Sequence, residues 1–180
     1  MRRVVLIMSM SLDGYVVGPW GHAGTSAEPP ELKAWKLDRI GKAGTHIMGR
    51  TTYEEMASYW PTSGDPYAKP MNEIPKVVFS RTLEEAAWAT TAIARGELAE
   101  EIDALRRQPG GEIVAWGGAS FAQSLSRAGL IDEYALVIKP VAYGGGLPIF
   151  RDLPAALELE LLEARVFDGG VALHRYSRAT

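Results

Sequence analysis

The sequence contains no cysteine in its 180 residues. This absence excludes disulfide bonds, thiolate nucleophiles, iron–sulfur clusters and zinc sites built on cysteine. Histidine is also scarce, since only His22, His46 and His174 are present and they lie far apart in the chain. No HExxH pair occurs, so the sequence does not predict a catalytic metal site. The Walker A motif of phosphate-binding loops and the GxSxG motif of serine nucleophiles are absent as well.

A strong net charge and a long hydrophobic run are absent as well. The chain carries 19 Lys+Arg against 22 Asp+Glu, a net charge of −3, which gives no field to attract nucleic acid or an anionic membrane. The apolar run from Val4 to Met10 is shorter than the ~20 residues of a membrane-spanning helix. Asp13 and Gly14 follow it with no signal-peptide cleavage site. We therefore expect a cytoplasmic protein that binds neither nucleic acid nor a membrane.

What is present is typical of a folded globular domain, with 47% hydrophobic and 23% charged residues. No internal repeat or long linker divides the chain, so residues 1–180 are predicted to form one domain. Short apolar segments predict strands at Val4–Met10, Thr45–Met48, Lys76–Ser80, Glu112–Trp116 and Glu133–Pro140. Between them, helical patterns predict helices at Pro30–Gly41, Thr51–Tyr59, Gly96–Arg107 and Ser120–Ala128. This alternation indicates an α/β domain with a mostly parallel central sheet and flanking helices.

The pattern changes near the end of the chain. Leu157–Phe167 and Val171–Tyr176 both have the composition of strands, and the Asp168-Gly169-Gly170 sequence between them is typical of a hairpin turn. We therefore expect a C-terminal antiparallel hairpin to close the sheet. Two segments rich in Gly, Pro and Ser are predicted to be surface loops, Gly18–Pro30 and Pro61–Pro75.

Three strand-to-loop junctions carry residues that suit a phosphate. In IMGRTTYE (47–54), Arg50 stands where a strand passes into a helix, whose first N–H groups attract anions. A threonine helix cap beside a surface arginine explains this motif equally well. PKVVFSRT (75–82) offers a similar but weaker turn, for which an ordinary strand-to-loop junction is the favoured interpretation.

The third junction, IVAWGGASFAQSL (113–125), places two glycines between an apolar strand and a helix. Glycine permits a close approach of the backbone to a ligand, although a tight turn alone would also account for the pair. The motif lacks the GxGxxG pattern, which disfavours a standard Rossmann site. Because the carboxyl ends of parallel strands share one edge of a sheet, the three junctions together predict a site for a multiply phosphorylated nucleotide. The five tryptophans are predicted to serve mainly in packing, and some could also form a wall for a flat heterocycle.

The motifs SLDGYVVG, IMGRTTYE, PKVVFSRT, AWGGASF and LIDEYALVIKPVAYGGGLPIF, in this order, resemble the dihydrofolate reductase-like superfamily. More closely, they resemble the RibD C-terminal domain family, whose reference activity is the reduction of 5-amino-6-(5-phosphoribosylamino)uracil in riboflavin synthesis. The resemblance covers nearly the whole chain. It implies the three-layer dihydrofolate reductase-like fold and an NADPH-dependent reductase of a small heterocyclic substrate.

The resemblance also implies roles for particular residues. Those expected to bind NADPH are Val17, Gly18, Gly49, Arg50, Thr51, Thr52, Ser80, Arg81, Thr82, Gly117, Gly118, Ala119, Ser120 and Phe121. Those expected near the substrate are Tyr53, Met56, Trp60, Trp116 and Gly145, the last within the rim Gly144–Gly146. Asp13 is expected to order the loop over the nicotinamide and to shape the substrate pocket, and either it or water is the candidate proton donor.

Two alternatives remain open at this point, a genuine dihydrofolate reductase and a nucleotide-binding module without catalysis. Folate is the less favoured substrate, because the first predicted helix offers only Glu31 and Asp38, out of register with the acid of folate enzymes. The stretch after the second helix offers only Lys69 where those enzymes keep an arginine. The resemblance further implies a homodimer, for which Tyr134–Val141 and the C-terminal strands are expected to supply apolar surface.

Overall fold

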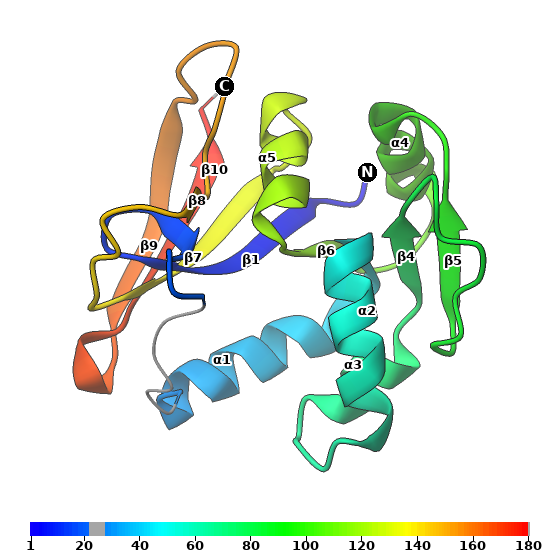
Figure 1. The fold of residues 1–180 in the computed structure, drawn as a ribbon, viewed down its shortest axis with the longest axis horizontal. Helices are drawn as coiled ribbons and strands as arrows, with labels where there is room; N and C mark the ends of the chain where they lie inside the picture. Colours follow the sequence, from blue (N-terminus) through cyan, green and yellow to red (C-terminus); the bar gives the residue numbers. More distant parts are fainter. Residues whose placement is uncertain (22–27, 180) are drawn as a thin grey trace.

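The computed structural model describes residues 1–21 and 28–179, and its largest element is an eight-stranded sheet (Figure 1). Its strands are β1 (Val4–Ser11), β3 (Ala43–Gly49), β4 (Lys76–Phe79), β5 (Thr91–Ala94), β6 (Glu112–Trp116), β7 (Glu133–Lys139), β9 (Leu159–Val166) and β10 (Ala172–Arg178). Their order across the sheet is β5-β4-β3-β6-β1-β7-β10-β9. The pairs from β5 to β7 are all parallel, and β10 is antiparallel to both of its neighbours. The predicted sheet is thus confirmed.

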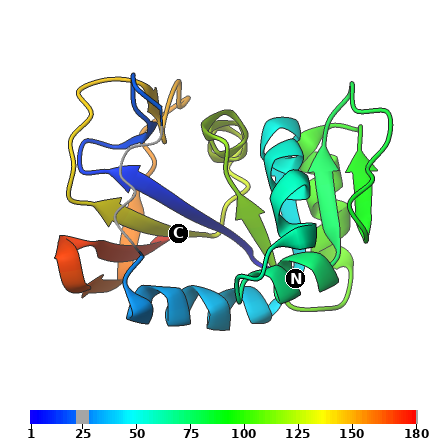
Figure 2. The same ribbon diagram turned by 60° about the horizontal axis from the view of Figure 1, so that its bottom comes forward.

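Within the described residues, five α-helices flank the sheet: α1 (Pro30–Gly41), α2 (Arg50–Tyr59), α3 (Ala68–Glu73), α4 (Leu98–Arg107) and α5 (Ala119–Arg127). Buried side chains of α4 and α5 share one apolar cluster with one face of the sheet. Those of α1, α2 and α3 pack in two clusters with the other face (Figures 1 and 2). None of the helices in the described residues is long and apolar enough to cross a bilayer.

The central strand β1 shows why its sequence is apolar almost throughout. Val4 and Leu6 face the α4 and α5 side, whereas Val5 and Ile7 face the α1 side, and each of the four is at most 4% exposed. Alternate residues of a strand point to opposite faces, so a strand covered on both faces needs apolar residues at every position. The buried parts of β6 (Ile113, Val114, Ala115) and β7 (residues 134–137) follow the same rule, whereas the buried Glu133 at the start of β7 is charged and is paired with Arg3, Arg39 and Arg175.

The C-terminal hairpin is confirmed, with Asp168–Gly170 forming a short 3₁₀ turn between β9 and β10. Gly169 and Gly170 have φ values of 74° and 76°, a conformation that glycine adopts without strain. β9 is the edge strand of the sheet, and its side chains Leu161, Leu162 and Val166 are exposed.

The prediction that Tyr134–Val141 offers apolar surface is wrong for most of that segment. It forms β7, which pairs with β1 on one edge and β10 on the other, and residues 134–137 are at most 3% exposed. A continuous apolar run cannot by itself distinguish a buried central strand from a strand that faces a partner. Among the C-terminal strands, β9 is the one that exposes large apolar side chains.

Some elements were not predicted. β5 (Thr91–Ala94) is a four-residue edge strand, and α3 (Ala68–Glu73) lies inside the predicted loop Pro61–Pro75. A short two-stranded pair, β2 (Tyr15–Val17) with β8 (Leu147–Pro148), joins the loops that follow β1 and β7 (Figure 2). The predicted loop Gly18–Pro30 contains residues 22–27, which lie outside the described residues, so that prediction is tested only at its ends.

Candidate functional site

A cavity of about 350 Å³ opens at the edge where the parallel strands end. We call it the larger cavity; its lining is Val16, Val17, Gly49, Arg50, Thr51, Thr52, Glu55, Gly117, Gly118, Ala119, Ser120, Phe121 and Leu147. The structure thus brings together two predicted motifs, the turn from β3 into α2 and the turn from β6 into α5. It also adds Val16, Glu55 and Leu147, which were not predicted.

Two helices begin at the larger cavity. The N-cap residues of α2 and α5 are Gly49 and Gly118, and neither helix start has a side-chain capping hydrogen bond. The first N–H groups of both helices are therefore available to a ligand, and each helix dipole adds partial positive charge. A Cβ atom at Gly118 would lie 3.3 Å from Oγ1 of Thr52, so the two helix starts approach closely. This arrangement suits an anion with more than one phosphate.

Arg50 connects the turn from β3 into α2 to the turn that follows β4. Its Nη1 donates to Oγ1 of Thr82 at 2.8 Å, and its Nε donates to Oε1 of Glu54 at 2.7 Å. The side chains of Arg50 and Glu54 are 46% and 50% exposed, so a phosphate could replace either contact. The guanidinium group matches a phosphate monoester in charge and in geometry.

The turn that follows β4, part of the predicted motif PKVVFSRT (75–82), contributes no residue to the lining of the larger cavity. Oγ of Ser80 accepts hydrogen bonds from the backbone N–H groups of Thr82 and Leu83, which stabilises the turn after β4. Arg81 instead pairs with Glu97, and both side chains are more than 70% exposed. Of Ser80, Arg81 and Thr82, it is Thr82 that contacts the lining of the larger cavity, through Arg50.

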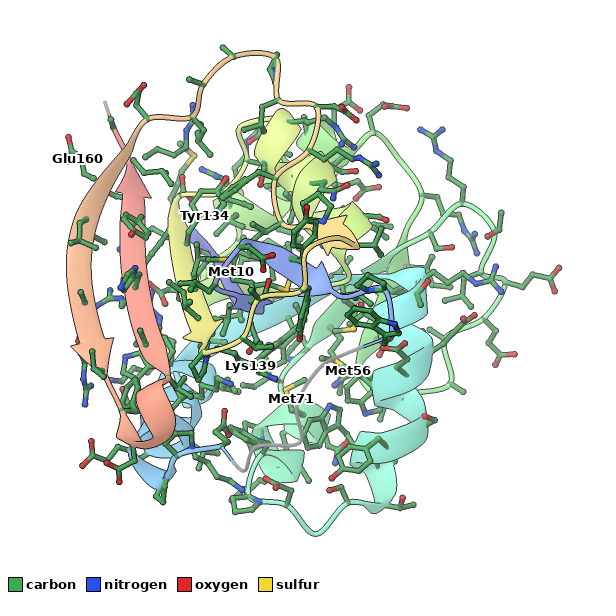
Figure 3. The ribbon with its side chains drawn as sticks, turned by 60° about the vertical axis from the view of Figure 1, so that its left-hand side comes forward. Met10, Met56, Met71, Tyr134, Lys139 and Glu160 are labelled. Carbon is green, nitrogen blue, oxygen red and sulfur yellow. The ribbon has the colours of Figure 1, made fainter. Side chains whose placement is uncertain are left out.

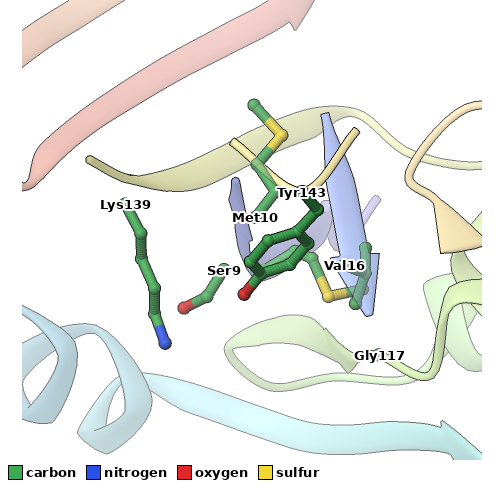
Figure 4. A pocket seen from close by; sticks show the side chains of 7 residues that line it. Ser9, Met10, Val16, Gly117, Lys139 and Tyr143 are labelled. Atoms are coloured by element: carbon green, nitrogen blue, oxygen red, sulfur yellow. The ribbon is translucent and has the colours of Figure 1, made fainter. Parts of the chain in front are cut away.

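A second cavity, the smaller cavity, has a volume of about 150 Å³ (Figure 4). It is lined by Met8, Ser9, Met10, Val16, Gly117, Lys139 and Tyr143. Val16 and Gly117 line both cavities, so the two adjoin. The other five residues were not predicted. The available signal was a polar residue near the carboxyl end of an otherwise apolar strand, as at Ser9 and Lys139.

Asp13 orders the loop that follows β7. The resemblance implied instead that Asp13 orders the loop of Val17 and Gly18, and that role stays a prediction. The Asp13 carboxylate accepts hydrogen bonds from Oγ of Ser11 at 2.6 Å and from the backbone N–H groups of Tyr143 and Gly144 at 3.0 and 2.7 Å. The hydrogen bond from Ser11, followed by those from Tyr143 and Gly144, lowers the pKa of Asp13 to about 2. A carboxyl group with this pKa carries no proton at neutral pH, and Asp13 lines neither cavity, which argues against its role as proton donor.

Val17 is the last residue of β2 and Gly18 follows it directly, and of the two only Val17 lines the larger cavity. Gly18 instead lies under Tyr143, since a Cβ atom at Gly18 would come within 3.0 Å of the tyrosine ring. Gly145 lies in the loop between β7 and β8, near Pro19. The loops after β1 and β7 therefore pack against each other at the mouth of the site.

The other predicted substrate residues form an apolar cluster on the α2 side. Tyr53 is 4% exposed, and its hydroxyl accepts a hydrogen bond from the backbone of Trp88, which makes it a core residue. Met56, Trp60 and Trp116 are half-buried around this cluster, and none of them lines the larger or the smaller cavity. Figure 3 shows Met56 on α2, whereas Met10 and Lys139 come from the ends of β1 and β7.

A third cavity of about 110 Å³ lies next to the smaller one and shares Ser9 and Lys139 with it. At this cavity Glu28 accepts hydrogen bonds from Nζ of Lys36 and, at 2.7 Å, from the hydroxyl of Tyr67. Burial, followed by the hydrogen bond to Glu28, raises the pKa of Tyr67 above its ordinary value. Glu28 is thus occupied in joining the start of α1 to the segment before α3.

Comparison with known proteins gives a consistent result for nearly the whole chain. The model of the RibD C-terminal domain matches residues 2–173. The Bacillus subtilis (strain 168) protein YyaP is 31% identical over 175 residues, which cover 94% of this chain and 92% of that protein.

Three solved structures share the fold. A putative riboflavin biosynthesis protein from Shewanella sp. PV-4 has a TM-score of 0.77 and 24% identity, with full coverage of both chains. The Thermotoga maritima diaminohydroxyphosphoribosylaminopyrimidine deaminase/5-amino-6-(5-phosphoribosylamino)uracil reductase has a TM-score of 0.72 and 13% identity, over 99% of this chain and 57% of that one. Enterococcus faecalis dihydrofolate reductase, complexed with NADP(H), has a TM-score of 0.67 and 16% identity over 99% and 97%. The dihydrofolate reductase-like fold is thereby confirmed.

Proposed function

The chain belongs to the RibD C-terminal domain family, and we propose that it is an NADPH-dependent reductase of a small heterocyclic compound. The proposed reaction resembles the reduction of 5-amino-6-(5-phosphoribosylamino)uracil. The observation that carries this proposal is the junction of the two cavities. One has two uncapped helix N-termini and an arginine for phosphates, and it adjoins a smaller, largely apolar cavity at Val16 and Gly117.

The residues of the larger cavity fit NADPH. The N–H groups at the start of α5 would hold the pyrophosphate, where Gly117 and Gly118 leave the backbone open to close approach. Arg50 and the start of α2 would hold the 2′-phosphate, with Thr51 and Thr52 beside them. This assignment predicts a preference for NADPH over NADH, because NADH lacks that phosphate.

When bound, NADPH supplies a hydride from C4 of its nicotinamide ring to an imine or carbonyl carbon. The chain's own contribution is to place the two ligands on either side of the Val16 and Gly117 junction. Met8 and Met10 line the smaller cavity with flexible apolar side chains that adapt to a flat ring. Asp13 holds the Tyr143 loop over this cavity through two backbone hydrogen bonds.

The structure gives no support to folate as the substrate. Glu31 and Asp38 are exposed on α1, Asp38 pairs with Lys42, and Lys69 is also exposed. None of Glu31, Asp38 and Lys69 lines any of the three cavities described above. Oxidation of NADPH with dihydrofolate, but not with 5-amino-6-(5-phosphoribosylamino)uracil, would overturn this choice of substrate.

The proposal is tested by titrating NADPH and NADH into the unmodified protein and into Arg50→Ala, with tryptophan fluorescence as the readout. Loss of a charge-assisted hydrogen bond costs roughly 1.5–3 kcal/mol, so Arg50→Ala should weaken NADPH binding about 10- to 100-fold. NADH binding should change little. Arg127→Ala removes an exposed arginine at the far end of α5 and is the matched control. Equal affinity of the unmodified protein for the two nucleotides would contradict the assignment.

We further propose that the protein is a homodimer that uses the β9 edge. Leu161, Leu162 and Val166 are 57%, 48% and 79% exposed on this one strand. The outer edge of β9 also has no paired strand within the described residues. An exposed apolar edge strand promotes association, and a twofold dimer is the commonest closed solution.

A further inference from the structure

Three polar side chains from three separate segments meet at the smaller cavity. Ser9 lies near the end of β1, Lys139 is the last residue of β7, and Tyr143 is in the loop that follows. Figure 4 shows the Ser9 hydroxyl, the Lys139 ammonium and the Tyr143 hydroxyl directed toward the same part of the cavity. β1 and β7 are adjacent parallel strands in which Ser9 pairs with Val137 and Ser11 with Lys139, so Ser9 and Lys139 share one face of the sheet.

The position of Tyr143 is fixed independently of any ligand. Its backbone N–H donates to Asp13, its ring packs on the bare backbone of Gly18, and only 7% of the residue is exposed. Lys139 is more exposed than Tyr143 and lines the third cavity as well as the smaller one. Water can therefore reach Lys139 more easily than the tyrosine hydroxyl.

Among the described residues, the remaining lining of the smaller cavity offers no acid. Met8, Met10, Val16 and Gly117 carry no side-chain proton that can be transferred. Asp13 stands outside the lining and is ionised at neutral pH. Reduction of a C=O or C=N group requires a proton on the oxygen or nitrogen, and the three polar side chains are the lining groups that bear one.

We propose that Lys139 is the proton donor of the reduction and that the Ser9 and Tyr143 hydroxyls bind the same substrate heteroatom. This inference rests on the proposed reductase function. As the substrate carbon gains the hydride, its π bond to oxygen or nitrogen breaks, and the heteroatom takes a proton from the Lys139 ammonium. The substrate gains two electrons, NADPH becomes NADP⁺, and the neutral amine of Lys139 recovers a proton from water. The substrate class is accordingly a flat compound whose reducible carbonyl or imine reaches Lys139 from the junction at Gly117.

The test uses the full chain with 5-amino-6-(5-phosphoribosylamino)uracil and a panel of small cyclic imines and carbonyl compounds. Lys139→Met should bind NADPH within about twofold of the unmodified protein, because Lys139 does not line the larger cavity. Its turnover should fall by about 10²- to 10⁴-fold, the usual range for a lost general acid. Lys139→Arg keeps the positive charge without a proton that is readily transferred, so it should preserve KM within a few-fold and lose kcat. Lys42→Met, at an exposed site at the end of α1, is the matched control.

Chemical rescue distinguishes proton transfer from a structural role. In Lys139→Ala, added ethylamine should restore turnover in proportion to its concentration, whereas a misfolded site would not respond. Turnover by Lys139→Met close to the unmodified rate, or a loss in Lys139→Ala that ethylamine does not restore while NADPH still binds, would overturn this inference alone. Absence of NADPH oxidation by the unmodified protein with every compound of the panel would overturn the proposed function, and the inference with it.

Discussion

His46 makes the stability of the fold depend on pH in a way that can be calculated. The residue lies on β3, is 0% exposed, and its Nδ1 accepts a hydrogen bond from Nε1 of Trp116 at 3.0 Å. An imidazole that accepts at Nδ1 must be neutral, with its proton on Nε2. Burial, followed by the nearby charge of Lys76, lowers the pKa of His46 from 6.5 to about 3. Between pH 6.5 and about pH 3, the unfolded chain therefore protonates this histidine, whereas the folded protein keeps it uncharged.

The sign and the size of the effect follow from linkage. Below pH 6.5 the unfolded chain binds a proton that the folded protein excludes, so the free energy of unfolding falls as the pH falls. The contribution of His46 is complete above pH 6.5 and is lost progressively down to pH 3. Each pH unit in this window corresponds to about 1.4 kcal/mol. Between pH 7 and pH 5 the expected loss is about 2 kcal/mol, which is a large fraction of the stability of a typical domain.

The assay is urea unfolding at pH 7 and pH 5, followed by tryptophan fluorescence. His46→Asn removes the titrating group and keeps an oxygen that can accept from Trp116, so it should be less stable at pH 7 but lose little more at pH 5. His174→Gln, at a half-buried position on β10, is the matched histidine control. A free energy of unfolding that is the same at the two pH values in the unmodified protein, or an undiminished fall in His46→Asn, would refute the reasoning.

Two further predictions concern the loop after β7 and the edge of the sheet. Asp13→Asn exchanges a charged acceptor for a neutral one, so the Tyr143 loop should loosen. Steady-state kinetics should then show kcat/KM lowered about tenfold, whereas fluorescence titration should show an unchanged affinity for NADPH. An equal loss of kcat/KM and of NADPH affinity would instead place Asp13 at the nucleotide. Leu161→Arg puts a charge on the exposed apolar edge of β9, so sedimentation should give a dimer near 39 kDa for the unmodified protein, twice 19.6 kDa, and a monomer for the variant. A monomer in both would remove the dimer proposal.

The sequence was sufficient to predict those helices and strands in which one physical signal dominated. Glu112–Trp116 and Pro30–Gly41 were predicted with their observed bounds, because an apolar run between turn residues and a regular helical stripe are each unambiguous. β5 (Thr91–Ala94) was missed because only four residues at a sheet edge, with Ile93 as the one large apolar side chain among them, are too few to show a pattern. α3 was missed because Pro70 suggested a loop, although proline is tolerated in the first turn of a helix, where no N–H partner is lost.

Part of the candidate site could likewise be predicted from the sequence, and part could not. The junctions at Gly49–Thr52 and Gly117–Phe121 were predicted because strand, glycine and helix start follow one another in the sequence, and the structure shows both around the larger cavity. The smaller cavity depends on which residues of β1 and β7 lie side by side, and that register is a long-range property that no local pattern reveals. Trp116 was placed near the substrate by its position beside Gly117, but its indole turns toward His46 instead.

The junction between the two cavities requires a residue without a side chain, and the reason is contact rather than backbone conformation. A Cβ atom at Gly117 would lie 1.7 Å from Cε of Met8, a distance that two non-bonded atoms cannot keep. Met8 is flexible and would have to move aside, but it lines the smaller cavity, whose volume is only about 150 Å³. Transfer between two ligands needs their reacting atoms about 3–3.5 Å apart, so nothing bulky can stand between them. In the proposed reaction Gly117 would therefore govern both the contact between the two ligands and the space left for the second one, because Met8 packs where a Cβ atom of residue 117 would lie.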